Sequence, residues 1–162
     1  MVKRMLAPIY FMKRTTGTHR ASVAPVLHRE EILDLQRLVR ALRVTPHVLE
    51  YATALVRRTR PSEDDSPPWI RESIAWGAGP RATQALVLAA KARTLLRGRF
   101  SVTRGDIRDV ALPVLRHRLL LNFPAEAQGL TVDDLICRLL VETPPFSPPE
   151  AHDAITRRIL RF

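Results

Sequence analysis

A turn rich in glycine and proline, Gly77-Ala78-Gly79-Pro80-Arg81-Ala82, constrains the fold more than any other stretch of the chain. Pro80 has no amide hydrogen and its φ angle is already helical, so it suits the first position of a helix. Gly77 and Gly79 permit a close approach of the backbone just before that helix. We therefore predict a helix from Pro80 to about Arg97, ended by Gly98. Its predicted apolar face has i, i+3, i+4, i+7 spacing and comprises Ala85, Leu88, Ala89, Ala92, Leu95 and Leu96.

Arg81 is unusual for its position in this helix. A cation in the first turn opposes the helix dipole, typically by ~0.3–1 kcal/mol. Free backbone N–H groups and an arginine at the same helix start form a corner that suits an anion such as phosphate. Spacing alone also allows a solvated arginine that the helix tolerates.

The remaining apolar periodicity predicts a small all-α bundle. One helix is expected from about Arg29 to Leu42, with a stripe made of Ile32, Leu35, Leu38, Val39 and Leu42. Thr45-Pro46 opens a second helix to about Arg58, and capping-box patterns at Thr103 and Thr131 open two more. We expect Pro113 to force a break or a restart in the helix that begins near Thr103. Residues 69–76 are expected to form a short helical turn that packs Trp69, Ile70 and Trp76 over the bundle, and residues 119–123 to be extended.

Composition excludes several protein classes. The single cysteine, Cys137, rules out an internal disulfide framework, and no apolar run approaches the ~20 residues of a membrane span. The formal charge of +10 would attract nucleic acid, anionic lipid or an acidic protein. However, the arginines are spread along the chain and few aromatic residues accompany them, so nucleic acid is not the expected partner. The default location is the cytoplasm.

The residues for independent catalysis are absent from the sequence. The chain has no Gly-x-x-x-x-Gly-Lys-Ser/Thr phosphate loop and no apolar strand ending in paired acids for Mg²⁺. Its five histidines lack metal-ligand spacing. We therefore predict no catalytic residue, no metal site and no ATP hydrolysis by this chain alone.

Three segments resemble the C-terminal lid of MoxR-type AAA+ ATPases: residues 76–82, Leu88-Ala89-Ala90-Lys91-Ala92-Arg93 and Pro113-Val114-Leu115-Arg116-His117-Arg118. The similarity extends from about Arg14 to Leu140. It implies that Arg81 is the sensor 2 arginine, which reaches the γ-phosphate of ATP, and that Gly79 and Pro80 shape its turn. The family commonly has serine where this chain has Gly79. Arg116 and Arg118 are secondary nucleotide-contact candidates, although a solvated basic segment explains them equally well.

The resemblance also implies a domain organisation. Residues 1–26 are expected to be an irregular N-terminal segment, a remnant of the connection between the ATPase core and the lid. Residues 27–143 are expected to form the helical lid, and residues 144–162 a proline-rich linker with a short C-terminal helix. On this basis the chain begins where the ATPase core, with its phosphate loop, should end.

The implied function is that of a lid in a chaperone-like ATPase that assembles or activates other proteins. The expected partners are an AAA+ core domain, other subunits of a ring and a von Willebrand factor A-domain protein. ATP and Mg²⁺ are expected only together with the core. Two alternatives remain open: a stand-alone basic helical module that binds nucleic acid or an acidic protein, and a pure oligomerisation element.

Overall fold

The computed structural model describes residue 12, residues 16 and 17, and residues 24–143. The chain divides into two compact units, Met1–Asp34 and Leu35–Phe162. The predicted C-terminal helix and most of the predicted N-terminal segment lie outside the described residues. The domain boundaries at residues 26 and 143 stay predictions.

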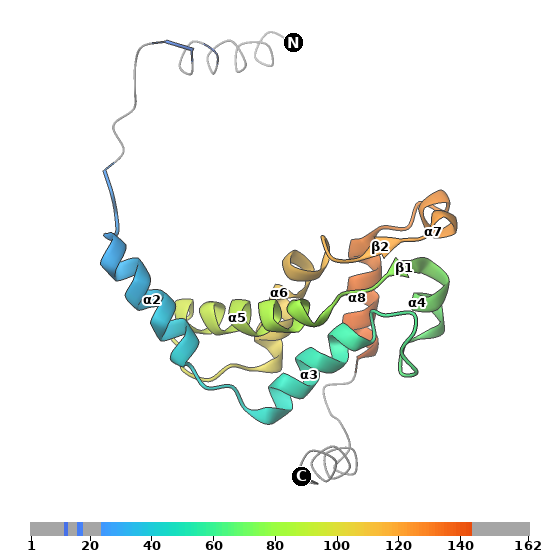
Figure 1. Ribbon diagram of the computed structural model, residues 1–162, viewed down its shortest axis with the longest axis horizontal. Coiled ribbons are helices and arrows are strands. Elements are labelled where there is room, and N and C mark those ends of the chain that lie inside the picture. Colours follow the sequence, from blue (N-terminus) through green and yellow to red (C-terminus); the bar gives the residue numbers. More distant parts are fainter. Residues whose placement is uncertain (1–11, 13–15, 18–23, 144–162) are drawn as a thin grey trace. The chain divides into compact units, whose positions relative to one another are not determined.

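The described residues are mostly helical, which confirms the predicted fold class (Figure 1). A two-stranded antiparallel sheet, in which Trp76 pairs with Leu120, accompanies the helices. The elements in chain order are α2 (Arg29–Ala41), α3 (Pro46–Arg57), α4 (Pro68–Ser73), β1 (Ile74–Trp76), α5 (Pro80–Leu96), α6 (Arg104–Leu115), β2 (Leu120–Leu121), α7 (Phe123–Ala127) and α8 (Val132–Glu142).

The predicted helix ends follow from local chemistry. Thr103 and Asp106 form a complete capping box at the start of α6, and Thr131 and Asp134 form another at the start of α8. Gly98 follows α5 with a φ angle of 66°, a left-handed conformation that favours glycine. These boundaries were predictable because residues close in sequence determine them.

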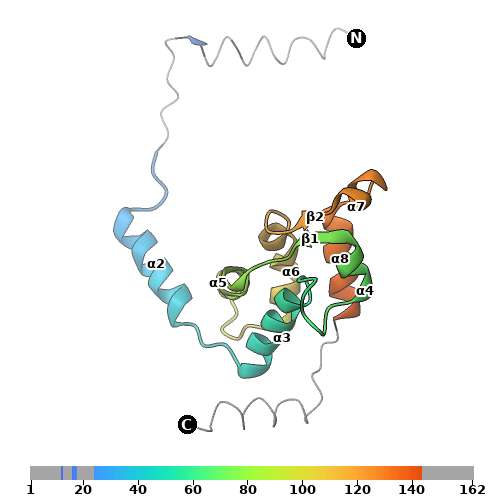
Figure 2. The same cartoon turned by 45° about the vertical axis from the view of Figure 1, so that its right-hand side comes forward.

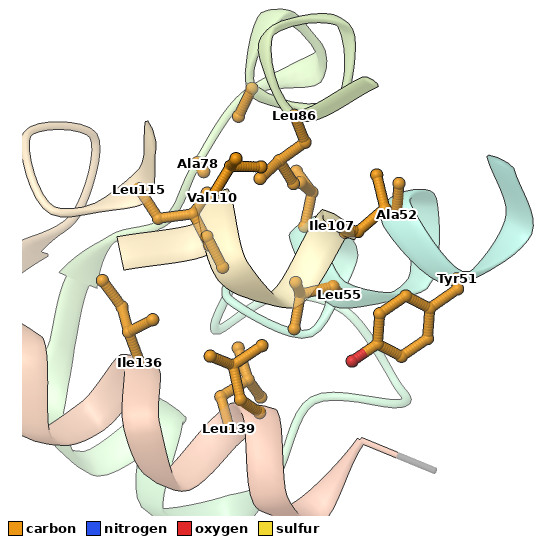
Figure 3. Close-up of a cluster of buried hydrophobic side chains, with 14 of the residues drawn as sticks. Tyr51, Ala52, Leu55, Ala78, Leu86, Ile107, Val110, Leu115, Ile136 and Leu139 are labelled. Atoms are coloured by element: carbon orange, nitrogen blue, oxygen red, sulfur yellow. The ribbon is translucent and has the colours of Figure 1, made fainter. Parts of the chain in front are cut away.

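The buried core lies in the second unit, where α6 packs between α5 and α8 (Figure 2). Leu86 from α5 points toward Ile107 and Val110 of α6, while Leu55 of α3 lies nearby (Figure 3). Leu139 of α8 closes the cluster from the other side (Figure 3). Several of these side chains have no exposed surface at all.

The apolar face predicted for α5 is wrong. The helix buries Ala82, Leu86, Ala90 and Thr94 instead. At 3.6 residues per turn the predicted and observed faces lie roughly 140° apart. Leu96 of the predicted face is 88% exposed, and Leu88 is 37% exposed. The helix is apolar on nearly every side, so periodicity could not select the face that tertiary packing uses.

Two other predictions also need correction. α6 continues through Pro113, because Pro113 and Asp109, four residues earlier, both lie on its exposed side and the carbonyl without an amide partner can face water. The helical turn ends at Ser73 rather than Trp76, because residues 74–76 pair with β2. Trp76 is consequently exposed rather than packed over the bundle.

The predicted stripe on α2 lies on a helix that buries none of its residues. Leu35 and Leu38 are half-exposed in the second unit. Leu42, just beyond the helix, packs partly against the core. The helix itself is confirmed, but its apolar side chains are largely open to water.

Candidate functional site

Arg81 occupies the first turn of α5, with Pro80 at the first helical position as predicted. Its side chain is exposed. Among residues 24–143 neither its guanidinium nor its backbone N–H has a hydrogen-bond or ion-pair partner. The positive charge of Arg81 therefore lies beside the positive end of a helix dipole, with nothing in the described chain to neutralise it.

The end of α3 holds the turn before Arg81 in place. The hydroxyl of Thr59 accepts a hydrogen bond from the Ala78 N–H at 3.0 Å and donates one to the Val56 carbonyl at 2.6 Å. Thr59 and Ala78 are both buried. Because neither can exchange its partner for water, this contact fixes the backbone of the turn to the bundle core.

Arg60 makes a second connection to the same turn. Its Nε donates to the Ala78 carbonyl at 2.8 Å, and its guanidinium contacts Glu63 at 3.1 Å. The pKa of Glu63 lies below its ordinary value, chiefly because Arg57 donates hydrogen bonds to this carboxylate. Glu63 thus stays ionised and holds Arg60 against the turn.

The two glycines of the turn have different roles. A Cβ at Gly77 would lie 2.5 Å from the Thr59 carbonyl oxygen, so close approach requires glycine there. A Cβ at Gly79 would meet nothing within 4 Å. The predicted close approach is confirmed at Gly77 only; Gly79 is the N-cap residue of α5, with no side chain to accept a capping bond.

An open groove of about 340 Å³ lies beside this turn. Arg60, Trp76 and residues 77–79 are among the residues that line it. Trp76 is 75% exposed. The turn, the groove and Arg81 together form the candidate site.

Thr59 and Arg60 were missed as part of this site. Neither residue lies in a sequence motif that indicates a binding role, and Arg60 is one of several arginines near the C-terminal end of α3. Their function depends on a contact between residues about twenty positions apart in the chain, which no local pattern reveals.

The secondary candidates Arg116 and Arg118 bind groups within the chain. Arg116 forms a two-point ion pair with Asp133, with distances of 3.1 and 2.5 Å. Arg118 donates to the Val114 carbonyl and contacts His117. A nucleotide contact from either residue stays a prediction.

No group of three metal-binding side chains occurs in the described part of the chain. None of its helices is long and apolar enough to cross a membrane.

Comparison with known proteins gives a consistent result. Residues 69–139 match the family model of the AAA lid domain. The chain is 32% identical over 115 residues to the chaperone MoxR1 of Mycobacterium tuberculosis. The aligned region covers 71% of this chain and 30% of MoxR1. The chain is 29% identical over 119 residues to the uncharacterised protein YeaC of Bacillus subtilis, covering 74% of this chain and 34% of YeaC.

A solved structure has the same fold. The crystal structure of a proposed ATPase from Cytophaga hutchinsonii superposes with a TM-score of 0.72 and 25% identity, over 86% of this chain and 42% of that one. The present chain thus spans about a third of the length of the two curated relatives. The family model, the relatives and the shared fold together show that the chain carries the lid domain of a MoxR-type AAA+ ATPase.

Proposed function

We propose that Arg81 acts as a sensor 2 arginine, contacting the γ-phosphate of ATP that a separate ATPase core holds. The observation that carries this proposal is a guanidinium that has no partner among the described residues, on a backbone turn fixed by Thr59 and Arg60. A guanidinium presents paired N–H donors that match phosphate oxygens, and the dipole of α5 adds to the attraction.

The fixed turn gives this contact a mechanical consequence. The turn is hydrogen-bonded to Thr59 at the end of α3, and Ala82 is buried in the core. A contact between Arg81 and a phosphate would therefore restrict the position of the whole bundle rather than of a loop. Loss of the γ-phosphate would release the lid, which is a hinge movement driven by one charge contact. The core would supply the phosphate loop, the Mg²⁺ site and the hydrolysis itself.

The name of one relative supports a proposal about the wider role. One of them is named a chaperone, so we propose that the complete ATPase works in the cytoplasm as a ring that assembles or activates other proteins. A von Willebrand factor A-domain protein is the proposed partner of that ring.

Binding of a labelled, non-hydrolysable ATP analogue tests the nucleotide role. A purified MoxR-type core without its own lid is titrated with the analogue, alone and with this chain. The chain should tighten binding by the core, and Arg81→Ala should abolish that gain. Arg29→Ala, which removes another exposed arginine without a partner among the described residues, should retain it.

Tryptophan fluorescence locates the effect. The chain has two tryptophans, so Trp69→Phe leaves Trp76 as the single reporter in the groove. With a tryptophan-free core, the analogue should change the Trp76 emission in the Arg81 protein and not in Arg81→Ala. If the chain adds nothing to the core but binds nucleic acid with a steep salt dependence, the basic-module alternative is correct instead.

A further inference from the structure

A second groove, separate from the Arg81 turn, opens on the unit Leu35–Phe162. It has a volume of about 410 Å³ and lies where the end of α2 and the start of α3 meet α5. None of the residues that line it belongs to the candidate site around Arg81. The groove therefore needs its own explanation.

The floor of this groove is apolar. Leu42, Val44 and Val87 contribute partly buried side chains that pack against the core on one side and line the groove on the other. Leu49 of α3 is 41% exposed. This arrangement leaves aliphatic surface open to water in a concave site, which an apolar side chain of a partner can cover.

The rim carries only positive charge. Arg40, Arg43 and Lys91 line the groove, and no acidic residue does. Lys91 Nζ donates to the Arg40 carbonyl at 3.1 Å, which places its charge at the C-terminal end of α2. The Arg40 and Arg43 guanidinium groups have no hydrogen-bond or ion-pair partner among the residues that the structure describes.

We propose that this groove binds an acidic polypeptide segment that inserts an aliphatic or aromatic side chain between carboxylates. Three cations around an aliphatic floor, with no acidic residue among those that line the groove, match that pattern in both charge and polarity. Nucleic acid fits the floor poorly, because no aromatic side chain lines it for base stacking. The role is independent of Arg81 and of ATP.

Peptide selection tests the proposal without a known partner. The full chain is immobilised and a random peptide library is selected against it; a recovered peptide is then synthesised and its Kd measured. The recovered sequences should combine Asp or Glu with a large apolar residue, and the Kd should weaken as salt rises.

Matched variants link binding to the groove. Arg43→Glu and Leu49→Asp should each weaken the recovered peptide about tenfold or more, since each places a like charge against it. Both positions are exposed, so folding should survive, which circular dichroism checks. Arg29→Glu makes the same charge reversal at a residue that does not line the groove, and it should leave the Kd unchanged.

Several outcomes would overturn the proposal. These are failure to recover any binder, recovered peptides without acidic enrichment, and a Kd insensitive to Arg43→Glu and Leu49→Asp. Concentration-dependent self-association that Leu49→Asp abolishes would assign the groove to a second copy of the chain instead.

Discussion

Asp106 is a carboxylate with 1% exposed surface at the start of α6. Burial alone would raise its pKa. Hydrogen bonds from Arg99 and from the N–H and hydroxyl of Thr103 outweigh burial and lower the pKa from 3.8 to about 2. The residue therefore remains charged inside the bundle and ties the α5–α6 connection to the capping box.

This lowered pKa predicts a pH-dependent stability. A carboxyl whose pKa falls on folding stabilises the folded state above its unfolded pKa and loses that contribution as the pH falls through the folded pKa. The lowered pKa of Asp106 corresponds to about 2 kcal/mol of folding stability, which is present above pH ~4 and lost toward pH ~2. Urea unfolding of wild type and Asp106→Asn should differ by about this amount at neutral pH, and the difference should shrink between pH ~4 and ~2. An equal difference at every pH would show that the charge is irrelevant.

At the scale of elements, the two glycines of the turn before α5 are expected to differ in their effect on stability. Gly77→Ala should destabilise the protein by about 1–3 kcal/mol, because its Cβ would overlap the Thr59 carbonyl and the Arg60 backbone. Gly79→Ser should stabilise it by about 0.5 kcal/mol, because serine can cap α5 and has room to do so. Thermal unfolding of both variants measures this; similar losses in both would contradict the assignment.

The face that α5 buries gives a second test at this scale. Leu86 has no exposed surface, whereas Leu88, two residues later, is 37% exposed. Leu86→Ala should therefore cost about 2–5 kcal/mol and Leu88→Ala distinctly less. The urea midpoints of the two variants, with unchanged slopes, measure the two losses of stability. A larger loss for Leu88→Ala than for Leu86→Ala would mean that the face predicted by periodicity is the buried one.

At the scale of the whole second unit, long-range arginine contacts close the bundle around α8. Arg108 of α6 donates to the Leu140 carbonyl at 2.6 Å and lies 3.4 Å from the Tyr51 hydroxyl of α3. Arg58, the residue directly after α3, donates to the Glu142 carbonyl at 3.2 Å. Cations at the C-terminal end of α8 thus stabilise the helix and fix it to two others.

Arg108→Met should cost about 1–3 kcal/mol, because the Leu140 carbonyl loses a charged donor in a partly buried position. Arg138→Met is the control: Arg138 contacts Trp69 and Glu142 at the surface and should cost less than ~1 kcal/mol. Chemical unfolding of both variants checks the difference. Equal costs would mean that α8 is not held through Arg108.

The sequence by itself determined where α5, α6 and α8 begin and where α5 ends. Pro80 starts α5, Gly98 ends it, and Thr103 and Thr131 cap the two helices that follow, because each signal acts within one turn of helix. The family resemblance, carried by residues 76–82 and two further segments, also lay in the sequence. It selected Arg81 as the candidate before any contact was known.

Only the tertiary structure decided which sides of the helices face the core and what surrounds Arg81. α5 is apolar almost all round, so contact with α3 and α6, rather than periodicity, selected Leu86 over Leu88. Trp76 is exposed because strand pairing between distant segments overrode the local helix. Thr59 and Arg60 hold the turn through contacts across about twenty residues, and the cationic groove joins residues from α2, α3 and α5. Such long-range contacts have no signature in a local sequence pattern, because they form only when the chain is folded.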